Sequence, residues 1–154
     1  MMAISLVAVT SCNKEDEDSE ENNSSGEHVT AKIDGTDWAA STNFDTTSAT
    51  INSNIFVLQG SDETGNAIRM NLINYTGAGT YVTGDNLSNT SSISYVTISP
   101  VASWMSTFNI GSGTINITTE DGSLAEGTFA FEGYNADDMT TKSVTEGSFK
   151  ANIE

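Results

Sequence analysis

The sequence predicts an all-β fold: an antiparallel β-sandwich of about eight to ten short strands, with a closed up-and-down barrel as the alternative. Residues from Val29 onward are rich in Thr, Ser, Asn and Gly, and short stretches alternate apolar with polar side chains. The chain contains a single proline, Pro100, and apolar residues at helical spacing are nearly absent. These observations predict one antiparallel β domain over residues 29–154.

Two predicted hairpins open the domain. Residues 28–38, HVTAKIDGTDW, place an Asp34-Gly35 turn of the type I′ class between two strands, and the second strand carries Trp38. Residues 54–75 repeat the arrangement at larger scale, with the acidic, glycine-containing loop 61–66 between two alternating strands. The apolar face of this second hairpin consists of Phe56, Leu58, Ile68, Met70 and Leu72.

The middle of the chain predicts two further strands. Residues 79–84, GTYVTG, form a short strand around Tyr81, and residues 91–100 form one in which Ile93 and Tyr95 share a face. Proline has no backbone N–H to donate, so Pro100 ends the second strand and predicts that it lies at a sheet edge. Residues 99–108, SPVASWMSTF, are the one stretch where a helical turn fits.

The C-terminal third predicts a three-stranded meander. Ile115 and Ile117 alternate in the first strand, Asp121-Gly122 forms the turn, and the chain returns in a second strand. The second strand places Gly127, Phe129 and Phe131 on one face, and the third places Gly147, Phe149, Ala151 and Ile153 on one face with Glu146, Ser148 and Lys150 on the other.

The N-terminal residues predict an export signal. Residues 1–9, MMAISLVAV, are apolar but shorter than the roughly 20 residues of a membrane-spanning helix, and they fit the apolar region of a signal peptide. The basic segment that precedes such a region is absent, so we expect the natural start to lie upstream. Residues 9–12, VTSC, resemble the lipobox of bacterial lipoproteins, which implies a signal peptide over residues 1–11 and a diacylglyceryl group on Cys12.

The residues after the cysteine strengthen this resemblance. Lys14, Glu15 and Asp16 are similar to the surface-export signal of Bacteroidota lipoproteins, a lysine followed by two acids. The resemblance implies an outer-membrane lipoprotein that is held by its lipid anchor on Cys12 and exposed on the cell surface. Several acyl chains on one residue suffice for stable anchoring, at about 0.8 kcal/mol per buried methylene.

Charge separates a tether from the domain and excludes some partners. Residues 12–28 contain seven acids and a single lysine, so they cannot bury enough apolar surface to fold and predict a disordered tether. The whole chain carries a formal charge of −16, from 21 acidic and 5 basic residues. Such a charge repels phosphate backbones and predicts no binding to nucleic acid.

The domain resembles a family of small, functionally uncharacterised surface lipoproteins of Bacteroidota, of the Flavobacteria type. The resemblance rests on IDGTDW near the start, GTY in the middle, then GTINITTEDG, EGTFAF and the closing VTEGSFKANI, and it covers the chain after residue 28. These are turn and strand motifs. The resemblance therefore implies a cell-surface β domain and transfers no catalytic residue.

The chain offers few groups for catalysis. His28 is its only histidine, which excludes a Ser-His-Asp triad at the domain's centre and a multi-histidine metal site. Glycosidases need only two carboxylates, and Glu126, Glu132 and Glu146 lie on predicted strands. Each belongs to the polar face of its alternation, so we interpret them as solvent-facing residues and predict that the protein is not an enzyme.

Two acidic turns and two tryptophans are the remaining candidate sites. Ca²⁺ binds six to eight oxygens, and the turns DGTD (residues 34–37) and NADD (residues 135–138) supply carboxylates. Neither turn matches an EF-hand loop. We therefore expect no cofactor and keep Ca²⁺ binding as a hypothesis. An exposed tryptophan stacks on sugar rings in β-sandwich carbohydrate-binding modules, and a core tryptophan is the alternative. The candidate residues are Asp34, Asp37, Asp137 and Asp138 for the metal, and Trp38 and Trp104 for a sugar.

A modification site and a function complete the predictions. The tripeptide Asp45-Thr46-Thr47 resembles the acceptor of Bacteroidota O-glycosylation, which implies a glycan on Thr46. The leading functional hypothesis is a non-catalytic binding module for a glycan, a peptide or another envelope protein. A structural or accessory envelope lipoprotein is the second hypothesis, and a glycoside hydrolase is the third.

Overall fold

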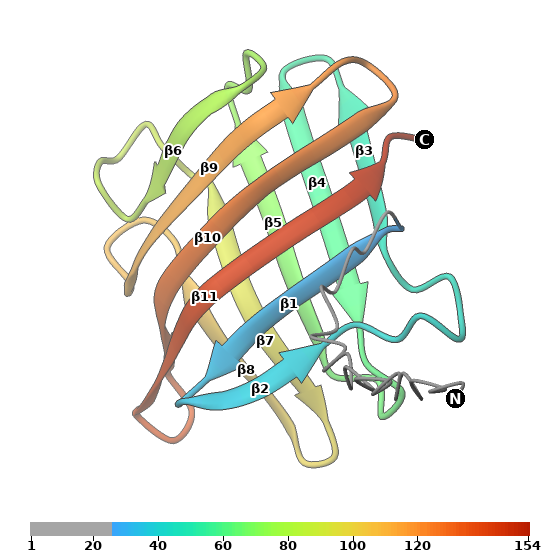
Figure 1. The fold of residues 1–154 in the computed structure, drawn as a ribbon. Helices are drawn as coiled ribbons and strands as arrows, with labels where there is room; N and C mark the ends of the chain where they lie inside the picture. The colour runs from blue at the N-terminus through green and yellow to red at the C-terminus, as the bar shows by residue number, and fades with distance from the viewer. Residues whose placement is uncertain (1–25) are drawn as a thin grey trace, which may run out of the picture.

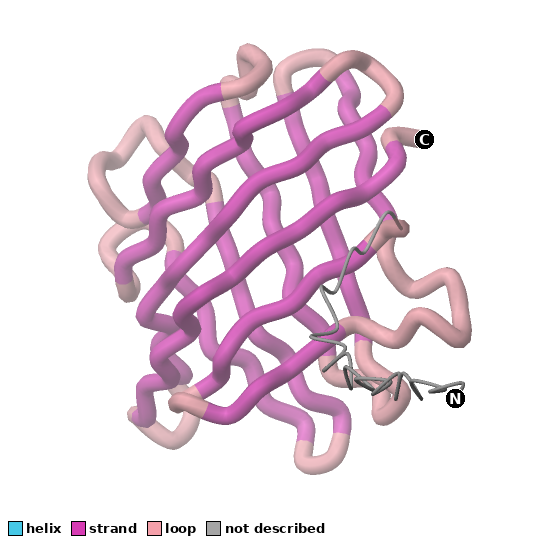
Figure 2. Tube along the Cα trace, viewed as in Figure 1, coloured by secondary structure: helices cyan, strands magenta, loops and turns pink. Residues whose placement is uncertain are grey.

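A computed structural model describes residues 26–154, and these residues form eleven β-strands and no helix (Figures 1 and 2). All pairs between these strands are antiparallel, so the predicted all-β antiparallel fold class is confirmed. The strands are β1 (His28–Ile33), β2 (Thr36–Ala39), β3 (Ser48–Asn52), β4 (Ile55–Ser61), β5 (Ala67–Ile73), β6 (Gly79–Thr83), β7 (Ser92–Ile98), β8 (Val101–Ser106), β9 (Ser112–Glu120), β10 (Leu124–Asn135) and β11 (Thr140–Asn152).

The strands form one curled sheet that folds into two facing layers (Figure 1). In the view of Figure 1 the front layer runs β6-β9-β10-β11-β1-β2 and the back layer runs β8-β7-β5-β4-β3. The layers join at a corner where Tyr134, near the end of the long strand β10, pairs with Met105 of β8. On the opposite side Ala49 of β3 forms a bridge with Ile153, so the two-layer arrangement also has barrel-like closure.

The core lies between the layers because each strand turns its apolar positions inward. Strands β4 and β5 contribute Phe56, Leu58, Ile68, Met70 and Leu72, which are all at most 1% exposed. This is the apolar face that the alternation predicts. The front layer contributes Ile115, Ile117, Phe129, Phe131, Val144, Phe149 and Ala151 from the predicted meander of β9, β10 and β11.

The middle of the chain differs from two expectations. The expected edge position of the strand before Pro100 is wrong, because β7 pairs with β5 on one side and with β8 on the other. Proline only ends this strand, at a position beyond the paired residues, and so removes no hydrogen bond from the sheet. Residues 101–106 form strand β8 and not the helical turn that the sequence allows there. Strand β3 lies in a stretch for which the sequence predicts no element.

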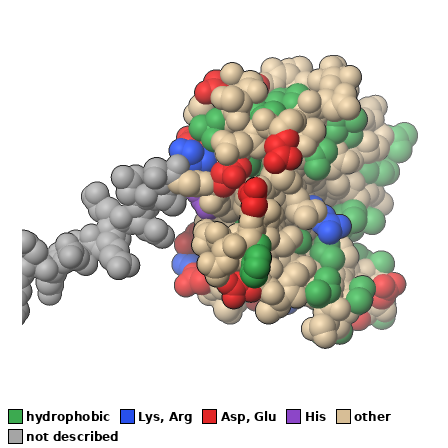
Figure 3. Space-filling model, turned by 90° about the vertical axis from the view of Figure 1, so that its right-hand side faces the viewer, with side chains coloured by type: hydrophobic (Ala, Val, Ile, Leu, Met, Phe, Trp, Pro, Cys, Tyr) green, Lys and Arg blue, Asp and Glu red, His purple; other side chains and the backbone are tan. Residues whose placement is uncertain are grey.

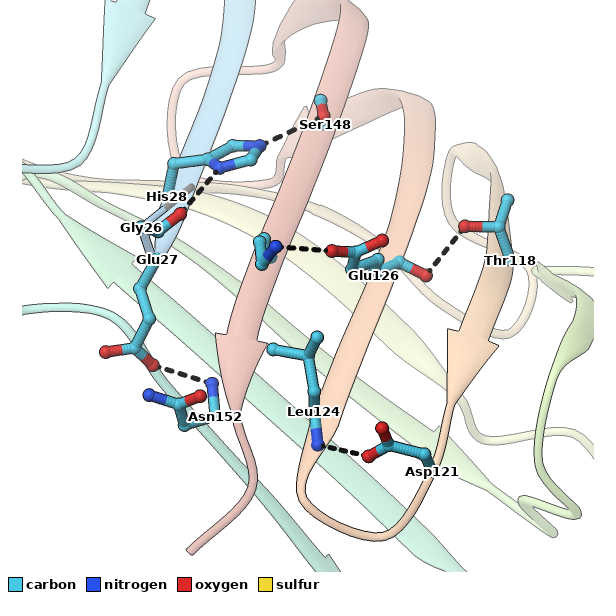
Figure 4. Close-up of polar contacts among 10 residues, drawn as sticks. Gly26, Glu27, His28, Thr118, Asp121, Leu124, Glu126, Ser148 and Asn152 are labelled. Atoms are coloured by element: carbon cyan, nitrogen blue, oxygen red, sulfur yellow. Dashed lines mark hydrogen bonds and ion pairs between the residues drawn. The ribbon is translucent and has the colours of Figure 1, made fainter. Parts of the chain in front are cut away.

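Side-chain contacts attach the beginning of β1 to the end of the front layer (Figure 4). The Oε1 atom of Glu27 accepts a hydrogen bond of 2.6 Å from the backbone N–H of Asn152. The ring of His28 lies 3.3 Å from the hydroxyl of Ser148 on β11, and its other nitrogen lies 3.3 Å from the carbonyl of Gly26. These contacts fix the start of β1 against β11, at the predicted beginning of the β domain.

No helix long and apolar enough to cross a membrane occurs within residues 26–154.

Candidate functional site

The outer face of the back layer has a hollow of about 480 Å³ that is open to solvent. We call it the Arg69 hollow. Strands β4, β5, β7 and β8 build its floor, in the interior of the back layer. Its lining residues are Val57, Arg69, Met70, Asn71, Ser92, Ser94, Val96, Ser103 and Met105.

Cross-strand register places the polar side chains of the hollow side by side. Arg69 on β5 pairs directly with Ser94 on β7, and Ser94 pairs with Met105 on β8. In the next row Asn71 lies opposite Ser92. Directly opposed residues in an antiparallel pair point to the same face of the sheet and lie about 5 Å apart, so these groups converge on one patch.

Arg69 differs from the other basic side chains of residues 26–154 because it has no carboxylate partner. It is also the only arginine of the chain, and no acidic residue lines the hollow around it. The three lysines of the same region are neutralised by ion pairs of 2.8 Å: Lys32 with Glu146, Lys142 with Asp34 and Lys150 with Glu126. The hollow therefore carries a local positive charge on a strongly acidic protein.

Apolar side chains border the polar centre of the hollow. Val57 is 42% exposed and Met105 is 38% exposed, because both occupy outward positions of their strands. Figure 3 looks along the layers and shows hydrophobic side chains gathered at its right-hand edge, where the outer face of the back layer lies. A site with apolar area around a few convergent polar groups is the usual composition of a ligand-binding surface.

The two tryptophans lie together, packed against the core. Trp104 on β8 is 8% exposed, and its indole N–H donates to the hydroxyl of Thr140 at 2.8 Å. Trp38 on β2 is half-buried, and both indoles contact the ring of Tyr95, with centroid distances of 6.3 Å and 6.0 Å. Sugar stacking needs an exposed ring. The expectation of an exposed tryptophan is wrong for Trp104, because its ring packs in the core between the layers.

Asp62 connects this aromatic cluster to the β4–β5 loop. Its Oδ2 atom accepts a hydrogen bond of 2.9 Å from the indole of Trp38, and its Oδ1 atom accepts from Thr64 and Asn66. Burial by itself would raise the pKa of the Asp62 carboxyl, but the hydrogen bonds from Thr64, Trp38 and Asn66 together lower it below its ordinary value. Asp62 is a structural carboxylate that no sequence motif singles out.

The acidic turns hold internal contacts. Asp34 accepts hydrogen bonds from Lys142 Nζ at 2.8 Å and from the backbone of Ser143, and the lysine above all lowers the pKa of its carboxyl. Asp138 accepts from the backbone and hydroxyl of Thr140. Asp37 is exposed on β2 and Asp137 is exposed in the β10–β11 turn.

Residues 26–154 contain no group of three or more His, Cys, Asp or Glu side chains arranged to hold a metal, so the Ca²⁺ hypothesis gains no site here.

The three candidate glycosidase carboxylates do not face one another across a cleft. Glu126 and Glu146 are each ion-paired with a lysine on a neighbouring strand, and Figure 4 shows the pair of Glu126 between β10 and β11. Glu132 is exposed on β10. The interpretation of these residues as the polar face of the front layer agrees with their positions.

The predicted modification residues lie in two different settings. The hydroxyl of Thr46 is half-buried and donates to the carbonyls of Ser41 and Ser61, at 2.9 Å and 2.8 Å. An attached glycan would displace these hydrogen bonds, so O-glycosylation of Thr46 stays a prediction. Cys12, Lys14, Glu15 and Asp16 lie outside the described residues.

Sequence reasoning missed the residues of the Arg69 hollow. Outward positions of a half-buried strand are normally solvent-facing, and Ser92, Ser94 and Ser103 carry no feature that distinguishes them from other strand serines. The available signal was Arg69, the only arginine, placed between the inward-facing residues Ile68 and Met70.

Fold and site together define a small antiparallel β domain with an open, cationic hollow on one sheet face. Comparison with protein-family models identifies the family: residues 26–151 match the Domain of unknown function (DUF6252), and the chain belongs to this family. No curated protein matches the chain, and no solved structure matches it.

Proposed function

We propose that this protein is a non-catalytic binding module on a cell-surface lipoprotein, and that its ligand lies on the Arg69 hollow. The single observation that carries the proposal is the unpaired Arg69 among convergent hydroxyl, amide and apolar side chains. A ligand with an anionic acceptor would pair with the guanidinium of Arg69, which is the only Lys or Arg side chain of residues 26–154 without a carboxylate partner. The ligand classes remain a glycan, a peptide or another envelope protein.

The position of the hollow favours binding because its floor is rigid. Strands β5 and β7, which carry Arg69 and Ser94, are each hydrogen-bonded to a strand on both sides. The side chains therefore project from a backbone that cannot move independently of the sheet. Such preorganisation reduces the conformational entropy lost when a ligand binds.

The anchoring part of the proposal rests on the N-terminal sequence. Cys12 receives the lipid, Lys14, Glu15 and Asp16 direct export, and the acidic residues up to the start of β1 separate the domain from the outer membrane. Intact-mass measurement of membrane-extracted protein tests this, and we expect a chain that begins at an acylated Cys12. A native chain that retains residues 1–11 and an unmodified Cys12 would contradict it.

Two matched substitutions test the binding face. Asn71→Tyr fills the hollow from an exposed position in the middle of β5, and Thr114→Tyr adds the same ring at an exposed position near the middle of β9, on the opposite layer. Tyrosine has a high β-propensity, so both variants should fold. The full chain and both variants are titrated against a panel of glycans, peptides and solubilised envelope proteins.

We expect Asn71→Tyr to abolish binding and Thr114→Tyr to preserve it. The reverse pattern would move the binding face to the front layer and contradict the proposed site. Failure of the unmodified chain to bind any member of the panel would favour the structural or accessory role instead.

A further inference from the structure

We infer that the Arg69 hollow recognises an acidic glycan, through the carboxylate of a uronic or sialic acid unit. This inference rests on the proposed function and specifies the chemical class of its ligand. The carboxylate would lie against the guanidinium of Arg69, the sugar hydroxyls against the side chains of Asn71 and the neighbouring serines, and the C–H face of the ring against Val57 and Met105.

Charge selects an anionic ligand at this position. The guanidinium of Arg69 is planar and presents parallel N–H donors that match the two oxygens of a carboxylate. No acidic residue lines the hollow, so nothing within it competes for these donors. The overall charge of −16 repels long polyanions. The ligand is therefore a short chain, or a chain with isolated acidic units.

The polar lining matches a sugar. A serine hydroxyl both donates and accepts, and an asparagine side chain carries one acceptor and two donors. Sugar hydroxyls have the same dual character, so hydroxyl and amide groups can satisfy them in either direction. Three serines and one asparagine line the hollow together with the cation. Ser94 is only 8% exposed, so Asn71, Ser92 and Ser103 are the polar groups open to a sugar. The apolar border supplies area for the less polar face of a ring.

The sheet itself disfavours an extended peptide. Peptides bind β-sheets mainly by adding a strand at an open edge, where backbone N–H and C=O groups are unpaired. The hollow lies in the interior of the back layer, where β5 and β7 are already paired with strands on both sides. A ligand must be recognised here by side chains alone, which suits a ring with many hydroxyl groups.

An aromatic side chain extends the same row of the sheet. Met105, at the border of the hollow, pairs directly with Tyr134 at the corner between the layers. Tyr134 is half-buried, and it occupies an outward position of β10. A second sugar unit that continues from the hollow along this row would reach the tyrosine ring.

Three charge variants of the full chain test the inference. Arg69→Gln removes the cation of the hollow, Arg69→Lys keeps the charge but loses the planar fork, and Lys32→Gln removes one charge on the opposite layer. Each is titrated by calorimetry against galacturonate, glucuronate and sialate oligosaccharides and against the same oligosaccharides after reduction of their carboxyl groups to alcohols. Sulfated oligosaccharides form a third set of probes. Circular dichroism and thermal melting confirm that each variant is folded.

We expect the unmodified chain to bind one or more carboxylated oligosaccharides and to bind the reduced forms at least about tenfold more weakly, as for the loss of a charged hydrogen bond. Arg69→Gln should show the same loss, Arg69→Lys an intermediate loss, and Lys32→Gln none. Equal binding of the carboxylated and reduced forms would overturn the inference and leave the binding function standing. Binding of sulfated glycans in place of carboxylated ones would also overturn it. An absence of all glycan binding would overturn it, and the Asn71→Tyr experiment then decides the proposed function separately.

Discussion

Among single residues, two reciprocal contacts between glycine and phenylalanine shape the front layer. Gly127 on β10 pairs directly with Phe149 on β11, and Phe129 on β10 pairs with Gly147 on β11. All four residues are buried on the core side of the sheet, and each ring lies over the glycine of the neighbouring strand. The missing Cβ atoms thus make room for two large rings that the space between the layers would otherwise exclude.

Gly127→Ala should destabilise the domain. The added methyl carbon would lie 2.7 Å from Cζ of Phe149 and still closer to the carbonyl oxygen of Asn116 on β9. Because the second contact is with backbone, the strand must shift, and overpacking of this kind costs about 1–3 kcal/mol. Urea denaturation measures the free energy of unfolding.

Gly26→Ala is the matched control for this prediction. A Cβ atom at Gly26 would meet nothing within 4 Å beyond its own chain neighbours, and the backbone there is not left-handed. We expect the control to change the free energy of unfolding by less than about 0.5 kcal/mol. An equal effect of both substitutions would show that the contact with Phe149 and Asn116 tolerates a side chain.

Among elements, the β4–β5 hairpin is joined to strand β2 by the carboxylate of Asp62. The acidic and glycine residues of 61–66 predict the loop of this hairpin, but they do not predict its role as a connection. Trp38 on β2 donates to Asp62, while Thr64 and Asn66 donate from within the loop. The carboxylate therefore stabilises both the turn and the contact between the layers.

The Asp62→Asn variant should be less stable than the unmodified protein by about 1 kcal/mol near neutral pH. An amide has one acceptor oxygen, so its NH2 group must face either the indole N–H of Trp38 or the donors of Thr64 and Asn66. The folded pKa of Asp62 lies below the ordinary value of an aspartate. Ionised Asp62 therefore stabilises the fold above the ordinary pKa, and the contribution is lost as the pH falls through the folded pKa. Denaturation of both proteins between neutral pH and roughly pH 3 measures the difference.

We expect the stability difference between the two proteins to shrink below about pH 4, the ordinary range of an aspartate pKa. Asp45→Asn, at an exposed loop position, removes the same charge and is the control. A difference for Asp62→Asn that is independent of pH would contradict a role for its ionised form.

For the molecule as a whole, the dominant physical property is the excess of negative charge. The formal charge of −16 is opposed by few cations, and the three lysines of residues 26–154 are already paired with carboxylates. The remaining acids repel one another in the folded chain. Self-repulsion of this kind lowers the stability of a compact state and is screened by salt.

Added sodium chloride should therefore raise the thermal unfolding midpoint. Between roughly 0.01 M and 0.15 M salt the screening length falls from about 30 Å to about 8 Å, so repulsion between distant acids is largely removed. We expect an increase of a few degrees, equivalent to about 1 kcal/mol for a chain of this size. Glucose at matched osmolality is the control, and a midpoint that is unchanged or lowered by salt would contradict the expectation.

Local patterns predict most of the strands but not all of their neighbours. The Asp34-Gly35 turn, the loop at 61–66 and the Asp121-Gly122 turn each join two strands that pair in the structure, because a short turn leaves its flanking strands adjacent. Strand β7 shows where this reasoning ends. Pro100 indicates an edge, but the pairing with β8 depends on the strand that follows the proline, which the local pattern does not reveal.

The candidate site shows a similar division. Alternation separates inward from outward residues in β5, so the outward position of Arg69 follows from the sequence. That it lies beside Ser94 and has no carboxylate partner does not follow, because these facts depend on the register between β5 and β7 and on the positions of acids far away in the chain.

Composition and local pattern alone are enough to specify the fold class, the turns, the inward face of most strands and the charge of the molecule, because each depends on residues close together in the chain or on simple counts. Only the folded chain decides which strands are neighbours and that Trp104 is buried. It also decides that Arg69 lies beside polar side chains and has no carboxylate partner. Those properties arise from contacts between residues distant in sequence. The pairing of β5, β7 and β8 assembles the outward face around Arg69, and the packing of the two layers against each other buries Trp104.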